Sequence, residues 1–299
     1  MRMQPNEGLM LRQPPRTPVS RVAPSLGSAP RSLVRSAPAP QLLQSAQAFT
    51  VKWANCESEV EEAQRLRHLV FVQEMGARPM PPPGTPEGLD ADRFDAFCDH
   101  LLVRAAGDDT GKPGPVIGTY RVLGPDAARR AGGLYSDGEF DLGRLDCLRP
   151  RAVELGRSCV HPAWRSGGVI MALWGALAQY MRLHELDTMI GCASVGIADG
   201  GDAARRLWLR LRAQHLVAPQ WQVRPYEPLR VDCRSGDAPG DVAAIPAAST
   251  PPLIKGYLRC GAQLLGPPAL DTAFNTADLP MLMRIADLAP RYRKHFLGA

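Results

Sequence analysis

Residues 152–186 read AVELGRSCVHPAWRSGGVIMALWGALAQYMRLHEL, and this stretch decides the fold. Apolar residues recur through 152–160, which predicts a buried strand. Arg165-Ser-Gly-Gly168 follows, and a mainly apolar run continues to about residue 185, which predicts a long helix. A helix that begins after glycines presents free backbone N–H groups to an anion. We therefore expect a phosphate-bearing ligand at this junction; an ordinary glycine-containing turn is the alternative.

Two charged residues, Glu154 and Arg157, interrupt the apolar strand. Charged side chains in such a strand are exposed, paired or functional. Regular alternation would send these two side chains to opposite faces of a sheet. A bulge at Gly156, which lies between them, would bring both to one side. A structural ion pair is the alternative interpretation.

The segments around this stretch alternate between strand and helix patterns. Because the two types alternate along the chain, we expect an α/β fold with a mixed central sheet flanked by helices. Strands are predicted at 49–53, 99–105, 116–123 and 188–192, and helices at 57–74, 203–213 and 253–261, with strand-like sequence after the last helix.

Charge is distributed unevenly along the 299 residues, whose net charge is +5. Residues 1–50 carry six arginines and one acid, so residues 51–299 hold 29 basic and 29 acidic groups. We predict a disordered Arg/Pro/Ser-rich tail over 1–46 and a folded domain over 47–299. A neutral domain argues against nucleic acid as a partner. The tail resembles a transit peptide or a weak tether to an anionic membrane; a dispensable solvated segment is the alternative.

Several chemistries are disfavoured by spacing. Seven widely spaced cysteines without a CxxC or a zinc pattern argue against a disulfide framework and a structural zinc site. Asp90-Ala-Asp92 lacks the glycine and distal glutamate of a calcium loop, so no metal is expected. Cys159-Val-His161 has no third orienting residue, which disfavours a thiol nucleophile. The apolar run 169–181 is shorter than the roughly 20 residues of a spanning helix. The protein is expected in the cytoplasm, either free or peripheral at the inner membrane.

The charged residues and the glycine segment together resemble known acyltransferases. Arg165 to Ile170 is similar to the Arg/Gln-x-x-Gly-x-Gly/Ala loop of the GNAT superfamily and departs from it at Ile170. That departure disfavours the diphosphate of coenzyme A more than the single phosphate of a carrier protein. Acyl-homoserine-lactone synthases contain four motifs in a fixed order: Arg-x-x-x-Phe, Asp-x-x-Asp, an arginine in a strand, and Glu-x-x-Arg. This chain has similar motifs in the same order, at Arg67–Phe71, Asp92–Asp95, Arg121 and Glu154–Arg157.

The chain resembles most the L-ornithine Nα-acyltransferases, over nearly everything from residue 47 to the end. The matching stretches are 71–76, 94–103, 116–121, 154–162, 173–174, 191–194, 251–259 and 291–296. His68-Leu69 departs from the aromatic-basic pair usual in that family. The resemblance implies a GNAT-like fold and transfer of a 3-hydroxyacyl group from acyl carrier protein to the α-amine of L-ornithine. This reaction starts ornithine lipid biosynthesis.

The resemblance also implies roles for individual residues. Glu154 is the candidate base for the amine, because a free α-amine is largely protonated at neutral pH, and Arg157 joins it in the catalytic pair. Substrate binding is expected at Arg67, Phe71, Asp92, Asp95 and Arg121. The acyl-pantetheine and the oxyanion are expected at Ser158, Cys159, Val160, Arg165, Gly167 and Gly168. No metal and no permanently bound cofactor are expected, since the donor arrives on the carrier's phosphopantetheine.

Acyl carrier protein is acidic, so we expect a basic surface on which it docks. The candidate residues for this surface are Arg205, Arg206, Arg210 and Arg212. A solvated helix face without a partner is the alternative interpretation. A separate O-acyltransferase would complete the lipid. Three other functions stay open. An acyl-homoserine-lactone synthase is disfavoured by the Arg-Tyr-x-x-His-Phe ending at Phe296, and a coenzyme A-dependent N-acetyltransferase by Ile170. A non-catalytic GNAT-like binding module is disfavoured by the intact Glu154 and Arg157.

Overall fold

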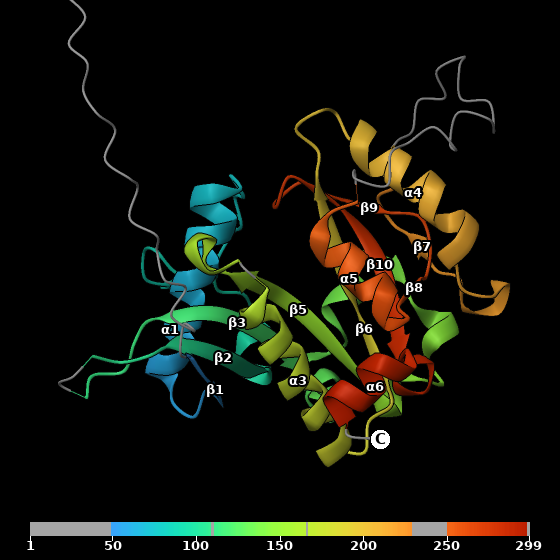
Figure 1. Cartoon of the computed structure of the whole chain (residues 1–299). Helices are drawn as coiled ribbons and strands as arrows, with labels where there is room; N and C mark the ends of the chain where they lie inside the picture. Colours follow the sequence, from blue (N-terminus) through green and yellow to red (C-terminus); the bar gives the residue numbers. More distant parts are fainter. Residues whose placement is uncertain (1–48, 109–110, 166, 229–249, 298–299) are drawn as a thin grey trace, which may run out of the picture. The chain divides into compact units, whose positions relative to one another are not determined.

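A computed structural model describes residues 49–108, 111–165, 167–228 and 250–297. In these residues the chain forms a mixed eight-stranded sheet with helices on both faces, which confirms the predicted fold class (Figure 1). A separate two-stranded ribbon is formed by β4 (Phe140–Asp141) and β7 (Arg224–Pro225). The predicted tail, 1–46, lies outside the described residues.

The first half of the sheet is antiparallel and follows the order β1-β2-β3-β5. Helices cover both of its faces, as the alternation along β2 shows: Leu101 packs with α3 and the next residue, Leu102, packs with α1. The elements are β1 (Phe49–Trp53), α1 (Glu57–Arg67), a π-helical continuation η1 (His68–Glu74), β2 (Asp99–Ala105), β3 (Val116–Leu123), α2 (Pro125–Ala131) and β5 (Ala152–Val160).

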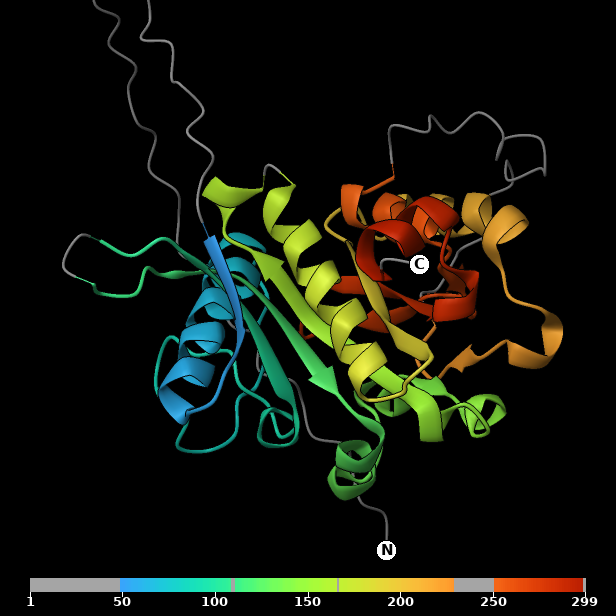
Figure 2. The ribbon, with the colours of Figure 1, turned by 60° about the horizontal axis from the view of Figure 1, so that its bottom comes forward.

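The second half of the sheet continues with β6, β10 and β8, and β9 pairs with β10. Figure 2 shows this half, coloured yellow to red, beside the blue and green strands of the first half. α3 connects β5 to the parallel strand β6 and contacts the C-terminal helix α6. The elements are α3 (Gly168–Leu183), β6 (Thr188–Gly196), α4 (Asp202–His215), α5 (Pro252–Cys260), β8 (Gln263–Leu264), β9 (Ala269–Asp271), β10 (Thr276–Arg284) and α6 (Pro290–Leu297).

The two halves join at a short seam between β5 and β6. These strands pair only over Ala152–Glu154 and Thr188–Ile190, and their pairing then ends. At the end of the seam the backbones are very close, because a Cβ on Gly191 would lie 2.4 Å from the carbonyl oxygen of Leu155. The rest of each strand forms one side of a gap in the middle of the sheet.

Most predicted elements agree with the structure. The predicted helix over 57–74 changes from α to π geometry at His68, and β6 extends beyond the predicted residue 192 to Gly196. α2 and α6 were not predicted. α2 nevertheless has ordinary boundary signals, since Pro125 opens it and Gly132, with a positive φ of 83°, ends it.

Candidate active site

A β-bulge places the two charged residues of β5 on one cavity. Thr119 of β3 pairs with Cys159 and Arg121 pairs with Gly156, so β5 has one residue more than β3 across this interval. Arg157 adopts a left-handed φ of 49°, which is unfavourable for a residue with a Cβ. The predicted bulge is confirmed, with the irregular backbone at Arg157. Glu154 and Arg157 both line a small cavity of about 70 Å³.

Glu154 is buried and held by three donors. It accepts hydrogen bonds from the backbone N–H of Tyr135 at 2.5 Å, from the backbone N–H of Ser136 at 2.8 Å and from the Ser136 hydroxyl at 2.5 Å. Burial raises the pKa of Glu154. Among the described residues no basic side chain forms an ion pair with it. A raised pKa makes this carboxylate a stronger base than an exposed glutamate.

Two further acids belong to this region: Asp278 lines the same cavity, and Glu139 contacts Cys192 of its wall. Burial raises the pKa of Glu139 to about 8 and that of Asp278 to about 6, and the neighbouring carboxylates add to both shifts. The Cys192 thiol donates to Glu139 at 3.6 Å, and the Thr276 hydroxyl donates to Asp278 at 2.9 Å. Ligand atoms of Glu139, Cys192 and Asp278 lie within 4.8 Å of one another. In the described parts of the chain neither acid forms an ion pair within 4.0 Å, although the charge of Arg157 acts on Asp278.

Sequence reasoning did not find these two acids. The sequence around Asp278 could have indicated a functional residue, because Asp278 is a charged residue within an apolar strand, like Glu154. Glu139 had no such indication, since it lies between the 3₁₀ turn η3 (Tyr135–Gly138) and β4.

The predicted arginines and aspartates form one buried network. Arg67 donates to both oxygens of Asp95, at 2.8 and 2.7 Å. Arg121 donates to Asp92 at 2.7 Å and to Asp95 at 3.2 Å, and Arg157 donates to Asp92 at 3.1 Å. Burial alone would raise the pKa of Asp95, but the hydrogen bonds and charges of Arg67 and Arg121 hold it well below its usual range.

The network is electrically neutral, because Asp90 completes it. Arg67 Nε lies 2.8 Å from Asp90 Oδ2, so the first aspartate of Asp90-Ala-Asp92 is paired with an arginine. Three arginines therefore face three aspartates. Of these six residues, Arg121 and Arg157 line the small cavity, whereas Arg67 and the three aspartates line neither cavity of the site. The structure thus brings five of the predicted charged residues together but gives only Arg121 and Arg157 access to a cavity.

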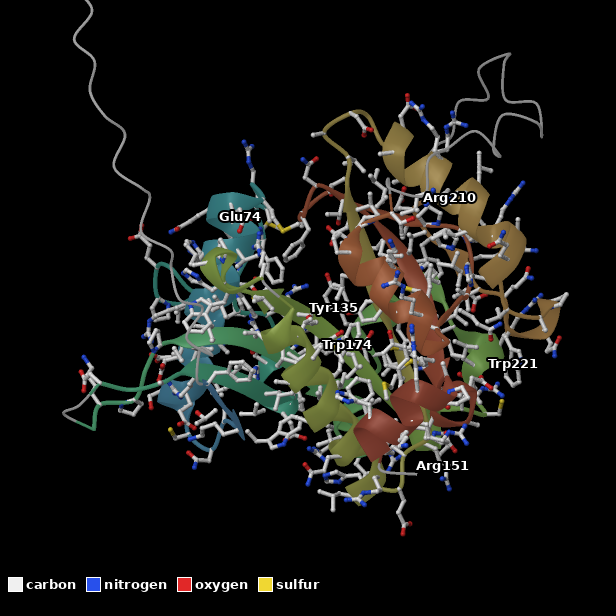
Figure 3. All side chains as sticks on the ribbon, in the orientation of Figure 1. Glu74, Tyr135, Arg151, Trp174, Arg210 and Trp221 are labelled. Carbon is white, nitrogen blue, oxygen red and sulfur yellow. The ribbon has the colours of Figure 1, made fainter. Side chains whose placement is uncertain are left out.

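A larger cavity of about 520 Å³ fills the gap between β5 and β6. The two cavities share wall residues at the seam, among them Leu155, Gly156 and Arg157. Figure 3 shows Tyr135 of the small cavity and Trp174 of the large one over this gap. Of the predicted ligand-binding residues, the large cavity is lined by Phe71, Ser158, Cys159, Val160, Arg165 and Gly167.

The predicted phosphate junction lies at this cavity's edge. α3 begins at Gly168, and Gly167 before it has a φ of 99°, a conformation that favours glycine. Arg165 donates to Val160 O at 3.1 Å and forms two hydrogen bonds with Glu74, at 2.6 and 2.7 Å. An anion at the start of α3 would meet free backbone N–H groups and would compete with Glu74 for the arginine.

The cysteine of β5 is unsuited to covalent catalysis. Cys159 is buried between α1 and the sheet, and burial raises the pKa of its thiol to about 12. A thiol in this state is not a nucleophile at neutral pH. The backbone of β5 can instead stabilise an oxyanion. Beyond Glu154 the strand does not pair with β6, so the N–H groups on that side face the gap and could donate hydrogen bonds to an oxyanion.

The predicted docking arginines lie on α4. Arg206 and Arg212 are exposed, and Arg205 and Arg210 are half-buried. Arg206 is 3.7 Å from Asp202, one turn earlier on the helix. In the part of the chain that the structure describes, none of the helices has both the length and the apolar character to cross a bilayer.

The chain is similar to a protein family, to curated proteins and to solved structures. Residues 66–175 match the family described as Acetyltransferase (GNAT) domain. The L-ornithine N(alpha)-acyltransferase of Brucella abortus (strain 2308) is 39% identical over 255 residues, which cover 82% of this chain and 88% of that protein. The protein of the same name from Rhizobium meliloti (strain 1021) is 35% identical over 266 residues, covering 87% and 88%. The solved structure of the AHL synthase LasI is 13% identical, with a TM-score of 0.47, and covers 85% of this chain and 96% of its own.

Proposed function

This chain belongs to the L-ornithine N(alpha)-acyltransferase family, and on that premise we propose that it transfers a 3-hydroxyacyl group from acyl carrier protein to the α-amine of L-ornithine. The product is lyso-ornithine lipid, and the reaction starts ornithine lipid biosynthesis. One observation carries the proposal: a small charged cavity and a large, mainly apolar one meet where β5 and β6 separate. An amino acid and an acyl thioester would react at that junction.

The small cavity suits ornithine by its charge. The arginines of the buried network are matched by Asp90, Asp92 and Asp95, whereas Glu139, Glu154 and Asp278 form no ion pair among the described residues. Burial raises the pKa of all three acids, so a bound cation would favour their ionised forms. Ornithine has two ammonium groups and one carboxylate, and its ammonium groups would supply that cation. We place its α-amine at Glu154, its side-chain ammonium at the Glu139–Asp278 pair and its carboxylate toward the arginines of the wall.

Within this arrangement Glu154 removes the proton from the α-amine, directly or through a water molecule. The neutral nitrogen attacks the thioester carbonyl, and open N–H groups of β5 stabilise the oxyanion that forms. As the carbon–sulfur bond breaks, the pantetheine sulfur leaves with the bonding electrons, and the second proton given up by the attacking nitrogen converts it to the free thiol. Arg67 and Asp95 act as positioning residues, because they hold Arg121 and the loop of Asp92 in place without lining either cavity.

The donor would occupy the large cavity, with its phosphate at the start of α3 near Arg165 and Gly167. Exposed arginines of α4 would meet the acidic carrier. A separate O-acyltransferase would act on the product, and the Arg-rich tail would support peripheral contact with an anionic membrane.

The test is a reaction of purified protein with 3-hydroxyacyl carrier protein and ornithine, followed by fragment mass spectrometry that locates the new amide. We expect Nα-acylornithine, and much less product from norvaline, which has the same carbon chain without the side-chain amine. Asp278→Asn should reduce the difference between the amounts of product formed from ornithine and from norvaline. The matched control is Asp126→Asn, because the Asp126 side chain is 77% exposed. Acylation from acetyl-coenzyme A but not from the carrier protein would overturn the proposal.

A further inference from the structure

Two tyrosine hydroxyl groups interrupt an otherwise apolar region of the large cavity. Tyr120 on β3 and Tyr257 on α5 are separated by 137 positions in the chain, and their hydroxyl oxygens lie 2.5 Å apart. Ser158 on β5 interacts with both hydroxyls. Burial raises the pKa of Tyr120 and of Tyr257, so both remain neutral phenols that can donate.

The tyrosine pair stands where three cavities meet. Tyr120, Leu155 and Tyr257 line the large cavity and also two smaller ones of about 60 and 50 Å³. The smaller cavities have mainly apolar walls, to which Met189 and Met283 of the sheet both contribute. Phe296 of α6 closes one side of the smallest. A hydrocarbon chain that starts at the seam therefore passes the hydroxyl pair before it reaches the apolar space.

A third polar group points to a ligand at the same place. The indole Nε1–H of Trp174 is buried without a hydrogen-bond partner among the described residues. Trp174 lines the large cavity and the smallest one, and its ring lies 5.5 Å from that of Tyr257. A buried donor without a partner is costly, and a hydroxyl group on a ligand would satisfy it.

We propose that Tyr120, Tyr257 and Trp174 form a hydroxyl-recognition site that selects acyl donors with a hydroxyl group close to the thioester carbonyl, while the two small cavities take the hydrocarbon beyond it. The inference rests on the proposed function, because it assumes that an acyl thioester occupies the large cavity. A chain hydroxyl can accept from the indole and exchange hydrogen bonds with the phenols. An unsubstituted chain leaves these groups without that partner, and such sites reject analogues that lack the hydroxyl.

The test compares two carrier-protein donors of equal chain length, one 3-hydroxylated and one unsubstituted, with ornithine as acceptor. We expect kcat/KM of the wild-type protein to favour the hydroxylated donor by at least about 10-fold. Tyr257→Phe and Trp174→Phe remove a polar group and keep an aromatic ring. Each should lower that preference by about 3- to 10-fold, mainly through loss of rate with the hydroxylated donor. Tyr226→Phe is the control, because Tyr226 is 60% exposed, and it should keep the wild-type preference.

The outcomes separate the inference from the function beneath it. Wild-type protein that uses both donors equally well to acylate ornithine overturns the inference and leaves the proposed function standing. The same holds if folded Tyr257→Phe and Trp174→Phe proteins, checked by thermal unfolding, both keep the full preference. Wild-type protein that acylates ornithine from neither donor overturns the proposed function, and the inference with it.

Discussion

Removal of Arg67 is expected to destabilise the protein strongly, because its charge is buried within an ion-pair network. The Arg67 side chain is 1% exposed and donates to both oxygens of Asp95 and to the carbonyl oxygen of Asp90. In Arg67→Met, Asp95 retains Arg121 at 3.2 Å, and Asp90 retains only Arg157 at 3.5 Å. Loss of one partner from a buried pair costs about 3–5 kcal/mol, because an unpaired charge stays buried.

The magnitude can be measured by thermal unfolding followed by tryptophan fluorescence. For a folded domain of this size, about 3–5 kcal/mol corresponds to a decrease in Tm of roughly 6–20 °C. Arg65→Met is the matched control on the same helix. The Arg65 side chain is 56% exposed and paired with Glu61 one turn earlier, so its loss should change stability by no more than about 0.5 kcal/mol.

The loss should also depend on pH. In the wild-type protein the pKa of Asp95 lies well below its usual range. The stability from this shift is fully present above the unfolded pKa of about 3.9 and is lost as the pH falls through the folded value. In Arg67→Met, burial favours the protonated form of Asp95. The difference in unfolding free energy between the wild type and the variant should therefore become smaller as the pH decreases from 7 toward 4. Equal stability of Arg67→Met and Arg65→Met, or a constant difference across this pH range, would refute the reasoning.

Three further predictions concern the site. Glu154→Gln should lower kcat by about 10²–10⁴-fold. Because burial raises the pKa of Glu154, the wild-type rate should fall with decreasing pH, with a midpoint above the pKa of about 4.3 for free glutamate. A variant that keeps the wild-type pH profile would contradict the assignment of Glu154 as the base. Gly167→Ala should destabilise the protein by about 1–2 kcal/mol and raise KM for the donor, because the φ of Gly167 is 99°. Gly168→Ala is the control: this residue lies in α3 and its Cβ would make only ordinary contacts, so the change should be neutral or stabilising. Chemical denaturation measures the stability of both variants, and donor titration measures their KM. Gly191→Ala should cost about 1–3 kcal/mol, because its Cβ would lie 2.4 Å from a backbone oxygen of β5; Gly196→Ala on the same strand has open space and should change the unfolding midpoint little.

Local patterns in the sequence predicted much of this protein. The strand β5, the glycine junction and α3 follow one another within 35 residues, so their order could be read from periodicity and glycine placement alone. The bulge was also predictable, because Glu154 and Arg157 would otherwise have lain on opposite faces. These features depend on neighbours in the chain.

The rest depends on pairings that the chain makes over long distances. Asp278 reaches the site because β10 inserts between β6 and β8, an order that is not the order of the sequence. Ser136 holds Glu154 from a turn 18 residues away. Arg165, predicted at a phosphate, is paired with Glu74, 91 residues earlier. No local pattern contains these partners, so the sequence could indicate which residues are polar but not what they contact.

The short seam between β5 and β6 has a consequence for folding. β1, β2, β3 and β5 pair in the order in which they are synthesised, so this half of the sheet can form from contacts with nearby segments. The other half must wait for β10, near the end of the chain, and within the sheet the halves are then joined by three residue pairs of β5 and β6. In native-state hydrogen exchange we expect two cooperative units with different opening energies. The two substrate cavities would be completed last, when the second unit docks on the first.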